Sequence, residues 1–318
     1  MKNCQWCTIY KCRPKIPTTA PLPVERVTPF LKPFSYVGID YFGPIDVTVG
    51  RRLDKRWISL FTCLTVRAVH LEVAYRLNTD SCIMAIRRFV LRRGPPIVIF
   101  SDNGTNLKAA NKELQQQIRR IDTTCANVFT NAKTRWCFNP PSAPHMRGVW
   151  ERMVRSVKST MNTLSSGNKL NDELLLTVIA EAEEIVNCRP LVYVPQESSD
   201  GEALTPNHFL RGCTTDFKGT TMAPTSEAEA LRSTYKRSQY IADELCRRWL
   251  KEYVPSLNIT TKWLEDPRPL KPGDLVFITD DQYRNGWIRG RVEQVRQGWS
   301  RQAGNGSYCQ WSISTTSG

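Results

Sequence analysis

Two acidic residues of this 318-residue sequence stand where their carboxylates could bind divalent metal ions. Asp40 lies within an otherwise apolar string, VGIDYFGP, and Asp102 ends another, IVIFSDNG. Carboxylates that converge from different elements can hold two such ions ~4 Å apart, where the ions stabilise the attacking and leaving oxygens of a phosphodiester. Oxygen ligands of this kind suit Mg²⁺. Taken alone, Asp-Asn-Gly at Asp102 is also an ordinary turn. The pair predicts a metal site if the two strands are neighbours in one sheet.

Glu151 is the best candidate for a third carboxylate. Between Glu113 and Glu151 the sequence contains no other glutamate, and its only aspartate is Asp122. Glu113 is expected midway along a helix, away from the strand ends, whereas Glu151 begins a helix behind a proline-rich loop. Arg155 and Lys158 follow at i+4 and i+7, on one face of that helix. A carboxylate followed by two cations could bind metal and then follow a DNA backbone.

The elements that must position these acids are expected to form a mixed sheet flanked by helices. Three strands separated by short polar breaks predict an antiparallel meander, and a later, wholly apolar run is typical of a strand buried on both faces. Six prolines in residues 13–33 predict an extended linker before the first strand. The strands are expected at 36–49, 57–64, 68–75, 97–100 and 135–138, and the helices at 79–93, 106–120, 149–164 and 171–187.

A composition change at residues 195–230, rich in Ser, Thr, Pro and Gly, precedes a second unit. A helix is expected at 227–253, followed by a small β unit with strands at 275–279 and 287–295. Trp287, Arg289 and Arg291 alternate along the second of these strands and could present a stacking and basic face to nucleic acid. After Gly298 the alternating apolar pattern is lost where a further strand is expected, so the sequence looks truncated or altered there.

The charge balance favours a polyanionic partner. Forty-four Lys and Arg against 30 Asp and Glu give a net charge of +14, and cations that contact phosphates release condensed counterions. A basic protein with no nucleic-acid role remains the alternative on charge alone. No run of 18 apolar residues occurs, so no membrane span is expected, and the first residues lack the apolar stretch of a signal peptide.

Eleven cysteines are expected to be reduced, buried or metal-binding rather than disulfide-bonded. The Cys4-x-x-Cys7 pair has the spacing of one side of a tetrahedral zinc site. No histidine pair precedes it, and structural zinc sites need four ligands. The site is therefore incomplete, and Zn²⁺ binding is not expected.

Residues 4–295 contain the strings VGIDYFGP, RAVHLE, TDSCI with AIRRF, SDNGTN and PHMRGVWERMVRSVK. Together these strings resemble the integrase region of BEL/Pao-type retrotransposon polyproteins. The resemblance implies a ribonuclease-H-like catalytic core over 34–215, with Asp40, Asp102 and Glu151 as its D,D,E triad. It also implies that 1–12 is the remnant of a zinc-binding module, that 13–33 is a linker, and that 216–318 carries a helix and a small SH3-like barrel.

What the resemblance implies for function is DNA integration. Two Mg²⁺ or Mn²⁺ ions on the triad would activate water to trim the element's DNA end, and then its 3′-hydroxyl to attack target DNA. Asn103 and Asn106 would position substrate beside the second acid, and His145 would lie in a loop that closes over DNA. The implied partners are DNA and further copies of the chain, with a nuclear location and a cytoplasmic particle stage.

Two alternatives remain open from the sequence. The chain could be a decayed or domesticated element fragment that binds DNA without catalysis. It could also be a nuclease that cleaves RNA in hybrids, an activity that usually relies on a further carboxylate, for which Asp46 and Glu72 are the candidates.

Overall fold

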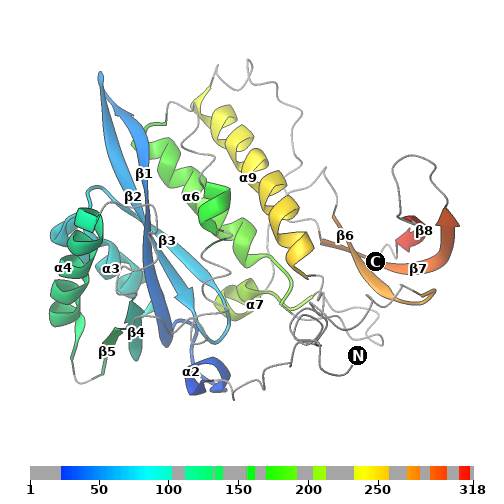
Figure 1. Ribbon diagram of the computed structural model, residues 1–318, viewed down its shortest axis with the longest axis horizontal. Helices are drawn as coiled ribbons and strands as arrows, with labels where there is room; N and C mark the ends of the chain where they lie inside the picture. The colour runs from blue at the N-terminus through cyan, green and yellow to red at the C-terminus, as the bar shows by residue number, and fades with distance from the viewer. Residues whose placement is uncertain are drawn as a thin grey trace, which may run out of the picture.

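The computed structural model describes residues 23–101, 112–131, 133–138, 155, 157–161, 170–191, 203–212, 233–257, 271–279, 287–298 and 308–315. Its larger sheet has the strand order β3-β2-β1-β4-β5 (Figure 1). β1 pairs antiparallel with β2 and β2 with β3, whereas β4 runs parallel to β1 and β5 parallel to β4. This order and these directions, with helices on both faces, are those of the ribonuclease-H-like fold, as expected. The strands are β1 (Tyr36–Val49), β2 (Arg52–Cys63), β3 (Val69–Ala74), β4 (Val98–Ser101) and β5 (Arg135–Phe138).

Helices cover both faces of this sheet (Figure 1). α3 (Thr79–Arg93) and α4 (Lys112–Phe129) lie on one face, over a buried cluster in which the rings of Phe61 and Phe89 stack 4.1 Å apart. On the other face lies α6 (Asp172–Asn187), and α9 (Thr234–Leu257) packs outside it and places Trp249 in the second buried cluster. Two short helices are α2 (Val24–Val27) and α7 (Pro206–Arg211).

Side-chain caps fix where the two central helices begin. The Asn78 Oδ1 accepts the Ser81 N–H at 2.9 Å, and α3 ends at Gly94, whose φ of 84° an L side chain rarely adopts. The Asn171 Oδ1 likewise accepts the Leu174 N–H at 2.7 Å at the start of α6. Both helices span the residues that the sequence predicts.

Several boundaries differ from the prediction; α9, for example, begins at Thr234, not at residue 227, and ends at Leu257, not at residue 253. The second strand begins at Arg52, not at residue 57, because Gly50 at φ 62° allows a tight turn that pairs Val49 with Arg52. The helix expected to end at residue 120 continues to Phe129, since Ile121 and Cys125 extend its buried face. The linker predicted to be extended over 13–33 contains one helical turn, α2.

A second sheet follows α9, with antiparallel strands in the order β6 (Leu275–Thr279), β7 (Trp287–Gly298) and β8 (Tyr308–Thr315). β8 lies where the sequence analysis found no alternation. Within it Cys309, Trp311 and Ile313 alternate with polar residues. The further strand expected after Gly298 is therefore present, and the loss of alternation does not hold for residues 308–315. The SH3-like barrel remains a prediction. Over the residues that the structure describes, no helix is long and apolar enough to cross a membrane.

Candidate active site

Asp40 lies in the middle of β1, on the face of the sheet that α6 covers. Its neighbours Ile39 and Tyr41 are buried in the cluster beneath α3 and α4, and successive side chains of a strand point to opposite faces. The Asp40 side chain is 25% exposed, and its Oδ1 accepts the N–H of Tyr41 at 2.7 Å. The acid is therefore held by the backbone on one oxygen and accessible to solvent.

The register between β1 and β4 relates the first acid to the second. In this parallel pair Ile39 is the partner of Ser101. The residues that follow these two in the sequence are Asp40 and Asp102. Ser101 is itself buried, and its Oγ accepts the indole N–H of Trp136 on β5 at 2.9 Å. The strand that leads to Asp102 is thus fixed on both sides at the level of Asp40.

Lys158 contacts Asp40 directly. Its Nζ donates to the Asp40 Oδ2 at 2.8 Å, across 118 residues of sequence. Residues 157–161 are helical, and Val157 and Met161 are buried in the α6-side cluster, so the neighbours of Lys158 anchor this helix on the sheet. Arg155, predicted to share its face, is exposed. Sequence reasoning assigned Lys158 to DNA and missed its contact with Asp40.

The remaining predicted residues fall outside what the structure describes, wholly or in their side chains. Trp287, Arg289 and Arg291 lie in β7, opposite Thr279, Phe277 and Leu275 of β6 in the backbone register. Outside the described residues lie Cys4, Cys7, Asp102, Asn103, Asn106, His145 and Glu151. The part of the chain that is described holds no group of three or more His, Cys, Asp or Glu placed to bind a metal ion, and it includes only one of the three predicted acids.

The two carboxylates considered for a nuclease lie away from Asp40. Glu72 is opposite Ser59 and Ser59 opposite Tyr41, so Glu72 belongs to the α3 face of the sheet, whereas Asp40 belongs to the α6 face. Asp46 is exposed, six residues further along β1, which at about 3.3 Å per residue is roughly 20 Å away. Neither acid can complete a site around Asp40.

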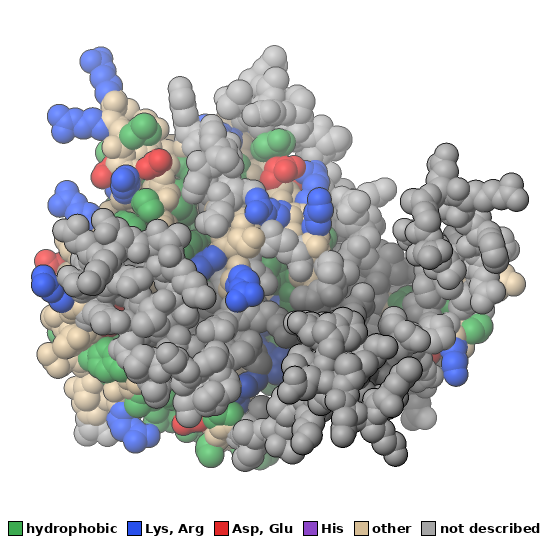
Figure 2. All heavy atoms as spheres, in the orientation of Figure 1, with side chains coloured by type: hydrophobic (Ala, Val, Ile, Leu, Met, Phe, Trp, Pro, Cys, Tyr) green, Lys and Arg blue, Asp and Glu red, His purple; other side chains and the backbone are tan. Residues whose placement is uncertain are grey.

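Basic side chains gather at the end of the β1–β2 hairpin, which projects beyond the rest of the sheet (Figures 1 and 2). Arg51, Arg52 and Lys55 are all exposed there. Asp54, the acid among them, is engaged by Arg56 at 2.6 Å, and this contact and the N–H of Lys55 lower its pKa. The hairpin therefore adds an exposed positive charge at one end of the sheet that contains Asp40.

Known sequences match parts of this chain. Over 200 residues the chain is 26% identical to the Gag-Pol polyprotein of feline leukemia virus, a match that covers 61% of this chain and 10% of the polyprotein. The chain is similar to a segment of a retroviral polyprotein. It spans only about a tenth of that relative's length. Residues 233–304 also match DUF5641, a family of unknown function.

Solved structures of a viral intasome and of viral integrase cores align with this chain at low TM-scores. An intasome of simian T-cell lymphotropic virus, in complex with PP2A regulatory subunit B56 gamma, covers 96% of this chain and 85% of its own, at 13% identity and a TM-score of 0.36. The catalytic core of BIV integrase covers 56% and 95%, at 16% identity and a TM-score of 0.34. The catalytic core of HTLV-2 integrase, in complex with magnesium, covers 56% of this chain and 97% of its own, at 15% identity and a TM-score of 0.32. The fold assignment rests on the strand order and directions given above.

Proposed function

We propose that this chain is an integrase-like polynucleotidyl transferase of a BEL/Pao-type retroelement, which joins element DNA to target DNA. One observation carries the proposal: Ile39 is the partner of Ser101 in the parallel pair β1 and β4. Asp40 follows Ile39 in the sequence, and Asp102 follows Ser101. The peptide bond places the Cα of Asp102 ~3.8 Å from the Cα of Ser101. The proposal is that Asp102 continues the register of β4, so that its carboxylate and that of Asp40 bind the same metal ions.

The contact between Lys158 and Asp40 supports Glu151 as the third acid. It anchors the helix of Lys158 on the face of the sheet that bears Asp40. Glu151 precedes Lys158 by seven residues, which is two helical turns and ~10 Å in the helix that the sequence predicts from residue 149. A similar segment in a retroviral Gag-Pol polyprotein and the net charge of +14 favour the same function.

The partly exposed carboxylate of Asp40 suits a hard divalent cation, and its Oδ2 already has a cationic partner. Asp40, Asp102 and Glu151 would hold Mg²⁺ or Mn²⁺, which when bound stabilises the attacking and leaving oxygens of the phosphodiester. Lys158 neutralises Asp40 in the metal-free protein. Its ammonium group would be available to a DNA phosphate once Asp40 held a metal ion. Further copies of the chain and a nuclear location belong to the same proposal.

The experiment is a joining assay with purified protein, Mn²⁺ or Mg²⁺, and a labelled duplex that ends in the element's terminal sequence. We expect products longer than the substrate from the unaltered chain, and none from Asp102→Asn at unchanged DNA affinity. Asp46→Asn, an aspartate on the same strand as Asp40 but distant from it, is the matched control and should retain joining.

Other outcomes separate the alternatives. DNA binding without joined products from the unaltered chain would overturn the proposal and favour a non-catalytic element fragment. Cleavage of RNA in a hybrid, without DNA joining, would favour the nuclease.

A further inference from the structure

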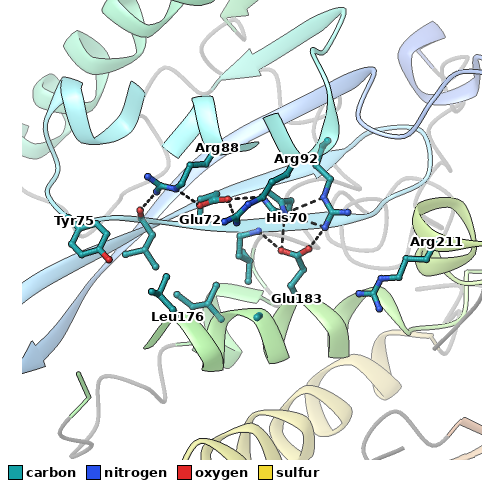
Figure 3. Close-up of a pocket in the computed structure, with 13 residues that line it drawn as sticks. His70, Glu72, Tyr75, Arg88, Arg92, Leu176, Glu183 and Arg211 are labelled. Carbon is teal, nitrogen blue, oxygen red and sulfur yellow. Dashed lines mark hydrogen bonds and ion pairs between the residues drawn. The ribbon is translucent and has the colours of Figure 1, made fainter. Parts of the chain in front are cut away.

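A cavity of about 510 Å³ opens at the free edge of β3, between α3 and α6 (Figure 3). β3 is the outermost strand of the larger sheet, so side chains from both of its faces reach the cavity. The volume falls within the roughly 300–1,000 Å³ usual for small-molecule sites. Asp40 and Lys158 are not among its lining residues.

Cations outnumber carboxylates in the cavity wall. Four arginines line it, Arg88, Arg92, Arg93 and Arg211, against the two glutamates Glu72 and Glu183. Glu72 receives hydrogen bonds from Arg88 at 2.7 Å and from Arg92 at 2.6 Å, and Glu183 is paired with Arg93. Arg211 is paired with Glu184, which lies outside the lining. Because Arg88 and Arg92 share Glu72, one positive charge of the wall is left uncompensated.

His70 lies between the two carboxylates. Its Nε2 lies 3.1 Å from Glu72 Oε1 and its Nδ1 lies 3.0 Å from Glu183 Oε2. Burial lowers the pKa of His70, but the hydrogen bonds to Glu183 and Glu72 outweigh burial and raise that pKa above its ordinary value. Only an imidazolium can donate to both carboxylates. The Arg93 Nε lies 3.4 Å from Nδ1, further than the Glu183 oxygen, so Glu183 is the nearer partner of Nδ1.

Two kinds of donor remain available to a ligand. Arg92 has a 61% exposed side chain and uses one of its five N–H donors, toward Glu72. On the free edge of β3, the Leu71 N–H donates to Glu183 at 2.9 Å and the Val73 C=O accepts from Arg88. The Val73 N–H points to the same side as its own C=O, and the structure gives it no acceptor within the described residues.

Apolar side chains of α6 line one wall of the cavity: Leu176, Ile179 and Ala180. Figure 3 shows Tyr75 and Leu176 at one end of the site and Arg211 at the other, with Arg88 and Arg92 entering from α3. Leu176, on α6, is 48% exposed, and Ala180 lines the cavity one turn further along the helix. A ligand that covers these side chains needs an apolar body.

We infer that this cavity binds a small organic anion, whose carboxylate or phosphate is held by Arg92 and the Val73 N–H and whose apolar body lies on Leu176 and Ala180. The positive wall selects an anion, and the cavity volume limits the ligand to a small molecule. The inference does not depend on strand transfer, because binding here can be measured without DNA or metal.

Titration calorimetry of the full chain tests this, with phenylacetate and phenyl phosphate as probes and phenylacetamide as the neutral counterpart. We expect saturable binding of at least one anion and none of the amide; the two anions distinguish a carboxylate site from a phosphate site. Arg92→Ala should weaken anion binding about tenfold, as expected for loss of a charged hydrogen bond. Arg87→Ala, an exposed arginine of the same helix outside the lining, should change it less than twofold.

A second variant tests the apolar wall without changing charge. Ala180→Trp should fill the cavity and abolish binding, whereas Thr177→Trp, exposed on the same helix but outside the lining, should leave it intact. The inference is overturned if neither anion binds, if phenylacetamide binds as well as phenylacetate, or if the Arg87 and Arg92 variants weaken binding equally.

Discussion

The Lys158 Nζ lies 2.8 Å from the Asp40 Oδ2, although 118 residues separate them. The contact joins the helix that follows Glu151 to the strand that carries the first predicted acid. It also means that Asp40 is not an isolated carboxylate in the metal-free protein. A divalent ion must compete with an ammonium group for the same oxygen.

Removing that ammonium should strengthen metal binding and weaken DNA binding. We expect Lys158→Met to bind Mn²⁺ more tightly than the unaltered chain, because Asp40 loses its internal competitor. The same variant should bind duplex DNA more weakly, because it loses one phosphate contact. Electron paramagnetic resonance of free Mn²⁺ measures the first effect and a salt titration of DNA binding the second. Lys55→Met, exposed on β2, is the control. Unchanged Mn²⁺ affinity in Lys158→Met would show that the pair does not oppose metal.

Local signals in the sequence predict the helices and strands, but they do not predict which residues far apart in the sequence come into contact. Gly94 marks the end of α3, and the apolar run before Asp102 predicts β4. Both signals can be read locally, because each depends on only a few neighbouring residues. Helix α4 runs nine residues past its predicted end, 129 against 120, because packing of Ile121 and Cys125 beneath the sheet outweighs weak local propensity.

The contacts at both sites could not be predicted from the sequence. His70 and Glu183 meet only because the edge of β3 lies against α6, as Lys158 and Asp40 meet only when a later helix packs on β1. No periodicity or spacing records such contacts, since the residues lie over 100 positions apart. The position of Asp40 within β1 was predictable, because an aspartate within an apolar strand is unusual.

The His70 cluster should make stability depend on pH. A raised pKa for His70 stabilises the fold at pH below about 6.5, and this contribution is lost as pH rises through the folded-state pKa. Burial raises the pKa of Glu72 and Glu183, but hydrogen bonds from His70 and from arginines outweigh it and lower both. Their contribution is present above about 4.5 and is lost as pH falls.

Urea unfolding at pH 5 to 9 checks this dependence. The free energy of unfolding should fall between pH 6 and 9 in the unaltered chain, and the fall should be smaller in His70→Gln. Glu183→Gln should destabilise by about 3 kcal/mol at pH 6, because it leaves a buried imidazolium with one carboxylate fewer. Parallel pH profiles for the unaltered and His70→Gln proteins would refute the role of His70.

Helix α9 should be required for the core to fold. Trp249 is 1% exposed, lies in the cluster with residues of α6, and stacks on Tyr253 at 4.9 Å. Trp249→Ala should therefore cost about 3–5 kcal/mol, measurable by thermal or urea unfolding. Residues 34–257 should give a stable fragment, whereas residues 34–215 should expose the outer face of α6 and aggregate. Equal stability of the two fragments would contradict this packing.

The buried thiols of α3 and α4 should be unreactive in the folded protein. Burial raises the pKa of Cys82 to about 12 and that of Cys125 to about 12, so almost no thiolate is present at pH 8. We expect iodoacetamide to label both residues only after unfolding, as read by mass spectrometry of peptides. Cys137, which is partly exposed, is the internal comparison and should react first. Rapid labelling of Cys82 in native protein would show that α3 opens.

The central claim is that Asp40, Asp102 and Glu151 act as one metal-binding set for DNA joining. Its most direct test is the amount of joined DNA product formed with Mn²⁺ by Asp40→Asn, Asp102→Asn and Glu151→Gln, each compared with Asp46→Asn at matched folding and DNA affinity. We predict that the three substitutions abolish the product and that Asp46→Asn does not. Joining that survives in any of the three, or that is lost equally in Asp46→Asn, would contradict the assignment of the site.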